Sequence, residues 1–98
     1  MATLIKIHKD GREEYKEQGA RVEAIAWNED GTFKEVADHK PVVGCSLLVG
    51  SVTARSYSDQ DYWLTTVVTE IIEEKLTEDG FIELVKFKTQ NSLYELRG

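Results

Sequence analysis

The stretch 62–96 constrains the fold of this chain more than any other segment. Nearly every side chain between positions 65 and 72 is β-branched, and such side chains fit a pleated sheet with little loss of freedom. Asp79-Gly80 follows, and this dipeptide favours a tight hairpin turn because it can supply the positive φ that the turn requires. Residues 81–89 indicate a returning strand, and residues 93–96 indicate a third strand after a short polar turn. We therefore expect three antiparallel strands in the second half of the chain.

The same turn signal divides the first half of the chain. Asp-Gly recurs at positions 10–11 and 30–31, each time between segments of strand composition. Residues 3–7 alternate so that Ile5 and Ile7 share one face of a half-buried strand. The segments on either side of the second Asp-Gly pair, 20–27 and 32–36, predict a further hairpin.

These patterns predict one all-β, mostly antiparallel domain over residues 1–98. The length suits a single core, and with 41% hydrophobic residues the chain is too apolar to be disordered. A small SH3-like or OB-like barrel of about five or six strands is the expected architecture, because closure removes exposed sheet edges. A two-layer β-sandwich is the second expectation.

Two segments are less well defined by their composition. Residues 12–18 have a helix-forming composition, but an isolated helix of this length is marginal, so a strand or irregular segment is favoured. Pro41, the single proline, ends a loop expected over residues 37–41. Residues 42–51 are apolar with two glycines and predict a strand that bends at a barrel corner. An extended segment over 51–57 and a polar loop over 58–61 should follow.

The charge balance excludes some classes of partner. The formal net charge is −6, which argues against binding to duplex nucleic acid or to an anionic membrane surface, because both depend on an excess of Lys and Arg. Plain solubility explains the acidity, and the acidity also suits a basic partner protein. The single cysteine, Cys45, leaves no internal disulfide, and no apolar run has the length of a signal sequence or a membrane span. We therefore expect a soluble cytoplasmic protein.

The C-terminal half carries a resemblance to other sequences. Residues 65–71 and 85–96 read TTxVTEI and VKFKTxNSxYEL, with the most specific part at 87–94. This pattern resembles small uncharacterised proteins of bacteria, their phages and mobile elements. The matching residues are those that a hairpin needs, so the resemblance implies a structural signature and a phage or mobile-element context, and it carries over no functional residue.

No combination of residues in the sequence indicates catalysis or a bound cofactor. Cys45 lies in an apolar run and is better explained as a small core residue than as a nucleophile. Together with His8 and His39 it matches no structural zinc spacing. The paired acids lie at or beside expected turns, and the sequence has no phosphate-binding glycine loop or nucleophile elbow. We expect a protein without enzymatic activity, metal or cofactor.

An aromatic and arginine cluster is the strongest candidate for a binding surface. Arg55, Tyr57, Tyr62 and Trp63 surround the expected loop at 58–61, and Tyr, Trp and Arg most often carry binding energy at protein interfaces. The alternative is that Trp63 and one tyrosine simply fill a thin core. The cluster makes a small non-catalytic protein-interaction or regulatory module the favoured function. A symmetric homodimer is a further expectation, because a thin β-domain can complete its sheet with a second copy.

Lys86 and Lys88 support an alternative function. They lie on one face of the expected strand 81–89 and Phe87 lies on the other. Lysines beside aromatic rings are typical of domains that bind single-stranded nucleic acid. Lysine is also the usual residue on a solvent-facing or edge strand. An OB-like or SH3-like domain associated with single-stranded nucleic acid is therefore the second functional hypothesis.

Overall fold

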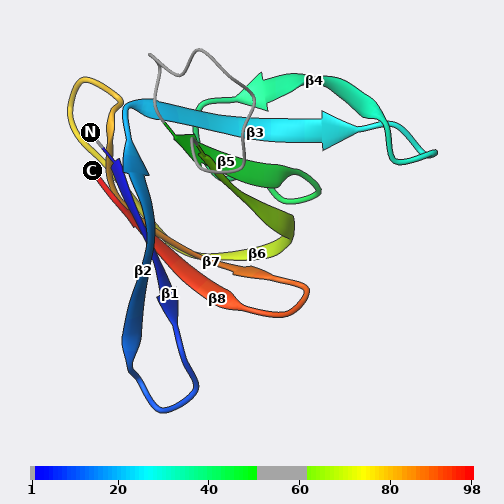
Figure 1. The fold of residues 1–98 in the computed structure, drawn as a ribbon. Helices are drawn as coiled ribbons and strands as arrows, with labels where there is room; N and C mark the ends of the chain where they lie inside the picture. The colour runs from blue at the N-terminus through cyan, green and yellow to red at the C-terminus, as the bar shows by residue number, and fades with distance from the viewer. Residues whose placement is uncertain (1, 51–61) are drawn as a thin grey trace.

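The computed structural model describes residues 2–50 and 62–98, and these residues form eight β-strands without a helix. The strands are β1 (Ala2–Ile7), β2 (Glu13–Gly19), β3 (Arg21–Trp27), β4 (Phe33–Asp38), β5 (Ser46–Gly50), β6 (Tyr62–Leu76), β7 (Ile82–Thr89) and β8 (Leu93–Arg97) (Figure 1). All paired strands are antiparallel and belong to one sheet of order β2-β1-β8-β7-β6-β5-β3-β4. The expected all-β, antiparallel class is confirmed.

The three Asp-Gly pairs form three hairpin turns of the same kind. In each turn the glycine N–H donates to the carbonyl of the residue three positions earlier, namely His8, Asn28 or Thr77. Gly11, Gly31 and Gly80 have φ of 87°, 85° and 86°, whereas no non-glycine residue among those described has a positive φ. The aspartates therefore do not adopt the left-handed conformation. In two of the turns the Asp side chain instead accepts the backbone N–H two residues later.

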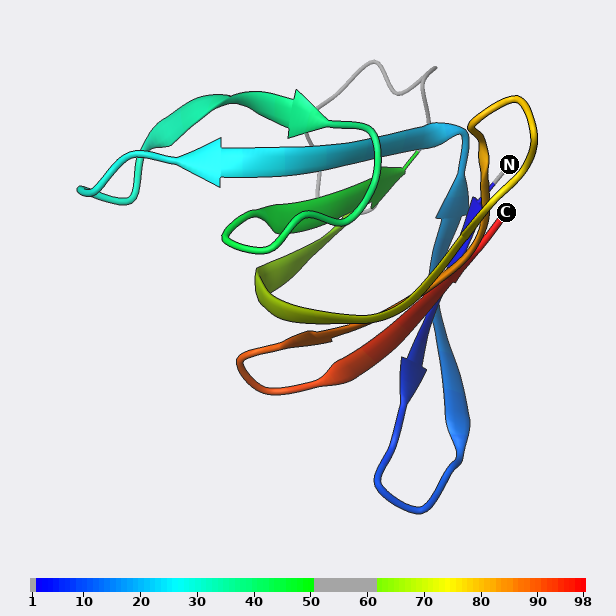
Figure 2. The ribbon, with the colours of Figure 1, turned by 180° about the vertical axis from the view of Figure 1, so that it is seen from behind.

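The sheet curls until its two halves face each other. Figures 1 and 2 show β3, β4 and β5 above the curved ribbon of β6, β7 and β8, and the β1–β2 hairpin with its turn pointing downward, below the other strands. Only Ala20 separates β2 from β3. A Cβ added at Gly19 would overlap the carbonyl oxygen of Gly50, so the ends of β2 and β5 approach within backbone contact. Among the described strands, the hydrogen-bonded order ends at β2 and β4 and does not close on itself.

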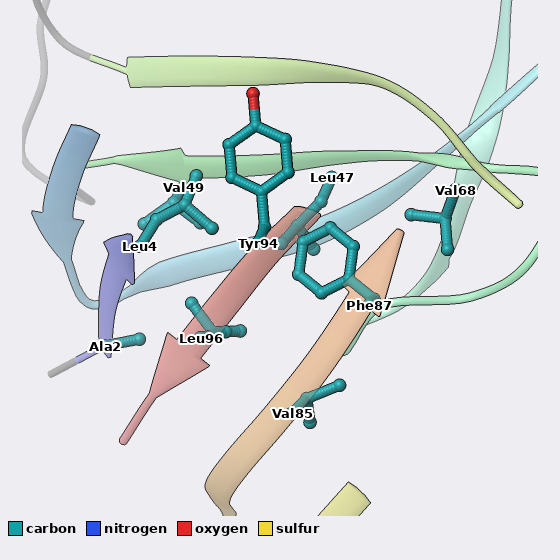
Figure 3. Packing of buried hydrophobic residues seen from close by; sticks show 9 residues of the cluster. All are labelled: Ala2, Leu4, Leu47, Val49, Val68, Val85, Phe87, Tyr94 and Leu96. Atoms are coloured by element: carbon teal, nitrogen blue, oxygen red, sulfur yellow. The ribbon is translucent and has the colours of Figure 1, made fainter. Parts of the chain in front are cut away.

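A cluster of nine buried side chains lies inside this curl (Figure 3). Phe87 stacks on Tyr94 with ring centroids 5.6 Å apart and an interplanar angle of 20°. The cluster contains Ala2, Leu4, Leu47, Val49, Val68, Val85, Phe87, Tyr94 and Leu96. In β1 the core cluster thus takes Ala2 and Leu4, whereas Ile5 is buried on the opposite face and Ile7 is half-buried.

Most expected strand boundaries agree with the structure, with one clear exception. Residues 12–18 fall largely in β2, which confirms the strand interpretation. The expected bent strand over 42–51 is wrong in its first part, because the chain turns at 43–44 and β5 begins only at Ser46. Gly44 has φ of 92°, and its N–H donates to the Val68 carbonyl, so this glycine serves a turn rather than a strand. The segment expected to be extended at 51–57 and the loop expected at 58–61 lie outside the described residues.

Candidate binding site

The sequence-predicted aromatic cluster can be placed only in part. Arg55 and Tyr57 lie outside the residues that the structure describes. Tyr62 is half-buried at the start of β6, and Trp63 is 36% exposed. Trp63 pairs in register with the core residue Val49, so its side chain lies on the core side of β6, at the margin of the cluster. Trp63 is thus neither a fully buried core residue nor a fully exposed contact residue.

A lysine from β2 covers Trp63. The Lys16 ammonium lies 4.8 Å from the centroid of the Trp63 ring, which is a cation–π contact. Lys16 also donates to Glu14, and His8 Nε2 donates to the same carboxylate at 2.8 Å. These two hydrogen bonds lower the pKa of Glu14 from its ordinary value to about 2. These contacts connect β2 to β6. The residue types in 12–18 alone could not indicate this connection.

The two lysines of the nucleic-acid hypothesis face carboxylates across the sheet. Lys86 is opposite Glu73 and Glu95 in the strand register. Lys88 is opposite Glu70, with 3.9 Å between Nζ and Oε2. The neighbouring rings of Phe87 and Tyr94 are 0% and 5% exposed and therefore cannot stack on bases. Within residues 2–50 and 62–98, the strand register thus places carboxylates, and neither an exposed ring nor a further cation, opposite the two lysines.

A cleft of about 850 Å³ opens at another part of the molecule. One wall is formed by the start of β3 together with the end of β4 and the two residues that follow it, and the other wall is the tip of the β6–β7 hairpin. This volume falls in the range typical of ligand-binding pockets. The first wall includes Arg21, Val22, Glu23, Asp38, His39 and Lys40, and the second includes Leu76, Phe81 and Ile82.

Arg21 and Lys40, the two permanent cations of the first wall, are already paired. The Lys40 ammonium donates to Glu74 Oε1 of β6 at 2.8 Å, and this hydrogen bond raises the pKa of Lys40. Arg21 donates to Glu23 at 2.6 Å. The two cations Arg21 and Lys40 are therefore each paired with a carboxylate of the chain.

The β6–β7 hairpin, whose tip forms the second wall, carries exposed apolar side chains in the cleft lining and a concentration of acids outside that lining. Phe81 is 71% exposed, the highest value for a large apolar side chain in the described part of the chain, and Leu76 is 42% exposed. Residues 70–83 contain six acids and one lysine, a balance of −5 against a formal net charge of −6 for the whole chain. The acids are Glu70, Glu73, Glu74, Glu78, Asp79 and Glu83. This surface was missed by our sequence reasoning, although a phenylalanine directly after an Asp-Gly turn was a visible signal.

The structure also places the residues that the sequence offered as a nucleophile or as metal ligands. Cys45 is buried, as expected from its apolar surroundings. His39 donates from Nδ1 to the Val22 carbonyl at 3.2 Å. Within these ranges no group of three or more His, Cys, Asp and Glu side chains is arranged to hold a metal ion. No helix in the described part of the chain is long and apolar enough to cross a membrane.

Comparisons with protein-family models, curated proteins and solved structures give no match for this chain.

Proposed function

We propose that this protein is a small non-catalytic protein-interaction or regulatory module that binds another protein at the cleft between β3 and the β6–β7 hairpin. The observation that carries the proposal is Phe81, which is 71% exposed on the wall of an 850 Å³ cleft. A large aromatic side chain left in solvent beside a concave surface is typical of an interface anchor. The resemblance of residues 65–96 to small phage and mobile-element proteins favours a similar origin.

The proposal includes a relation of the fold to small SH3-like or OB-like barrels. The near-continuous passage from β2 to β3 and the approach of Gly19 to Gly50 support this relation. In such barrels one strand commonly bends and contributes to both halves of the sheet. Here the bend at Ala20 would have that role, with the β3–β4 hairpin as an addition at the edge.

Site-specific photo-cross-linking tests the interaction proposal. A photoreactive phenylalanine analogue placed at position 81 in the native host should give a discrete cross-linked protein. The matched control is position 33, because Phe33 is 57% exposed near another Asp-Gly turn. A third variant with the analogue at Tyr62 tests the cluster predicted from the sequence. The proposal fails if position 81 gives no product or only the products seen at position 33.

A further inference from the structure

We infer that the occupant of the cleft is a basic polypeptide segment that carries apolar side chains among its lysines or arginines. This inference rests on the proposed function and names the class of partner for the same surface. It follows from the chemistry of the β6–β7 hairpin, which combines an apolar wall with uncompensated negative charge.

The apolar part of the surface belongs to the hairpin and the strand opposite. Leu76 and Ile82 are paired in register and both line the cleft, with Phe81 next to them at the turn. Val22 lies on the facing wall. These side chains provide a site for one or more apolar anchors, and burying Phe81 would remove the largest exposed fraction measured for an apolar side chain in ranges 2–50 and 62–98.

The charge of the hairpin determines which anchors can approach. Glu74 is paired with Lys40, Glu73 with Lys75 at 3.3 Å, and Glu70 with Lys88 at 3.9 Å. The remaining acids, Glu78, Asp79 and Glu83, form no ion pair with any described residue. The cations of the facing wall are already neutralised, so the missing positive charge must come from the partner. Complementary charge steers such a partner to the surface and excludes acidic ones.

The same charge distribution decides against other classes of partner. A nucleic acid or an anionic membrane would bring phosphates toward the acidic turn, which is unfavourable. A second copy of this chain would bring a further net charge of −6 to the interface. A basic segment with apolar side chains satisfies both the apolar wall and the unpaired acids.

A set of three synthetic peptides tests the inference on the full chain. The probe alternates lysine with valine around a central phenylalanine. In one control peptide glutamate replaces lysine, and in the other serine replaces the apolar residues. Binding is followed by the amide shifts of the protein in low salt and in 0.5 M salt. We expect the probe to bind and to shift the amides of Phe81 and Ile82, and we expect both controls to bind at least about tenfold more weakly.

Protein variants separate a defined surface from general charge attraction. Phe81→Ser should weaken probe binding about tenfold or more, whereas the matched variant Phe33→Ser should leave it unchanged. Glu78→Gln combined with Asp79→Asn should weaken it severalfold in low salt and less in high salt. Equal weakening by Phe33→Ser, or equal binding of the lysine–serine peptide, would overturn the inference in favour of unspecific attraction between opposite charges.

Two further outcomes separate the inference from the proposed function. Position 81 could give a cross-linked protein while the lysine probe does not bind, or while the glutamate peptide binds more tightly. Either result refutes the inference that the partner is basic but still supports the proposed protein-interaction function. A dimer detected by sedimentation that dissociates in Phe81→Ser also overturns the inference and assigns the surface to a second copy of the chain.

Discussion

Replacing Gly19 by alanine should destabilise the protein because no space exists for a Cβ at this position. The added carbon would overlap the carbonyl oxygen of Gly50 and lie 3.2 Å from its Cα. Gly19 does not have a positive φ, so the effect is steric rather than conformational. Both neighbours are backbone atoms that cannot rotate away, and β2 must therefore shift from β5. Overpacking of this kind costs about 3 kcal/mol, a large part of the roughly 5–15 kcal/mol that stabilises a small domain.

Denaturant unfolding of Gly19→Ala and Gly11→Ala measures this effect. Gly11 has φ of 87° with no atom near the added carbon, so alanine there costs only the backbone strain of about 1–2 kcal/mol. Only Gly19→Ala should also shift the indole N–H resonance of Trp63, because movement of β2 displaces Lys16 from the ring. If Gly19→Ala unfolds within about 0.5 kcal/mol of the wild type and leaves that resonance unchanged, the proposed approach of β2 to β5 is refuted.

Contacts of Glu14 and Thr65, and the burial of Phe87, lead to three further predictions about stability. The pKa of Glu14 is lowered from 4.5 to about 2, so its carboxylate stabilises the fold above about pH 4.5, and this stabilisation is lost as the pH falls toward 2. The free energy of unfolding, measured by denaturation at pH 6 and pH 3, should therefore change less between the two pH values in Glu14→Gln than in the wild type. Thr65 Oγ1 accepts a hydrogen bond from the backbone N–H of Leu47 in β5 at 3.0 Å. Thr65→Val should therefore reduce the free energy of unfolding by about 1–3 kcal/mol, and a variant as stable as the wild type would contradict this prediction. Phe87→Ala should cost about 3–5 kcal/mol and Phe81→Ser no more than about 0.5 kcal/mol in the same assay, and a reversed order would contradict the assignment of core and surface.

Local signals in the sequence were sufficient to predict the hairpins. The β-branched run at 65–72 and the three Asp-Gly pairs act over a few neighbouring residues, and the strands and turns occur where they indicate. The curl was not predictable in the same way. It depends on Gly19 and Gly50, which are distant in sequence and whose close approach has no local pattern. The strand expected at 42–51 failed for a related reason, because Gly44 turns the chain where its apolar neighbours suggested a strand.

The candidate site depends even more on distant residues. Residue type selected Trp63 and Tyr62, but the structure shows Trp63 beneath a lysine from β2. The cleft requires β3, the segment after β4 and the β6–β7 hairpin to meet, and no periodicity reports such a meeting. What the sequence did contain was Phe81 directly after Asp79-Gly80. Turn positions are normally polar, so an aromatic residue there was an available sign of a contact surface.

The most direct test of the account is a nuclear Overhauser measurement on the isolated protein. The curl brings β3 toward the β6–β7 hairpin and so creates the cleft, and its key contact is that between Gly19 and Gly50. We predict a strong cross-peak between protons of these two glycines, together with those of the paired residues Leu4 and Leu96. If the Leu4–Leu96 cross-peak is present and the Gly19–Gly50 cross-peak is absent, the sheet is open and the cleft does not exist.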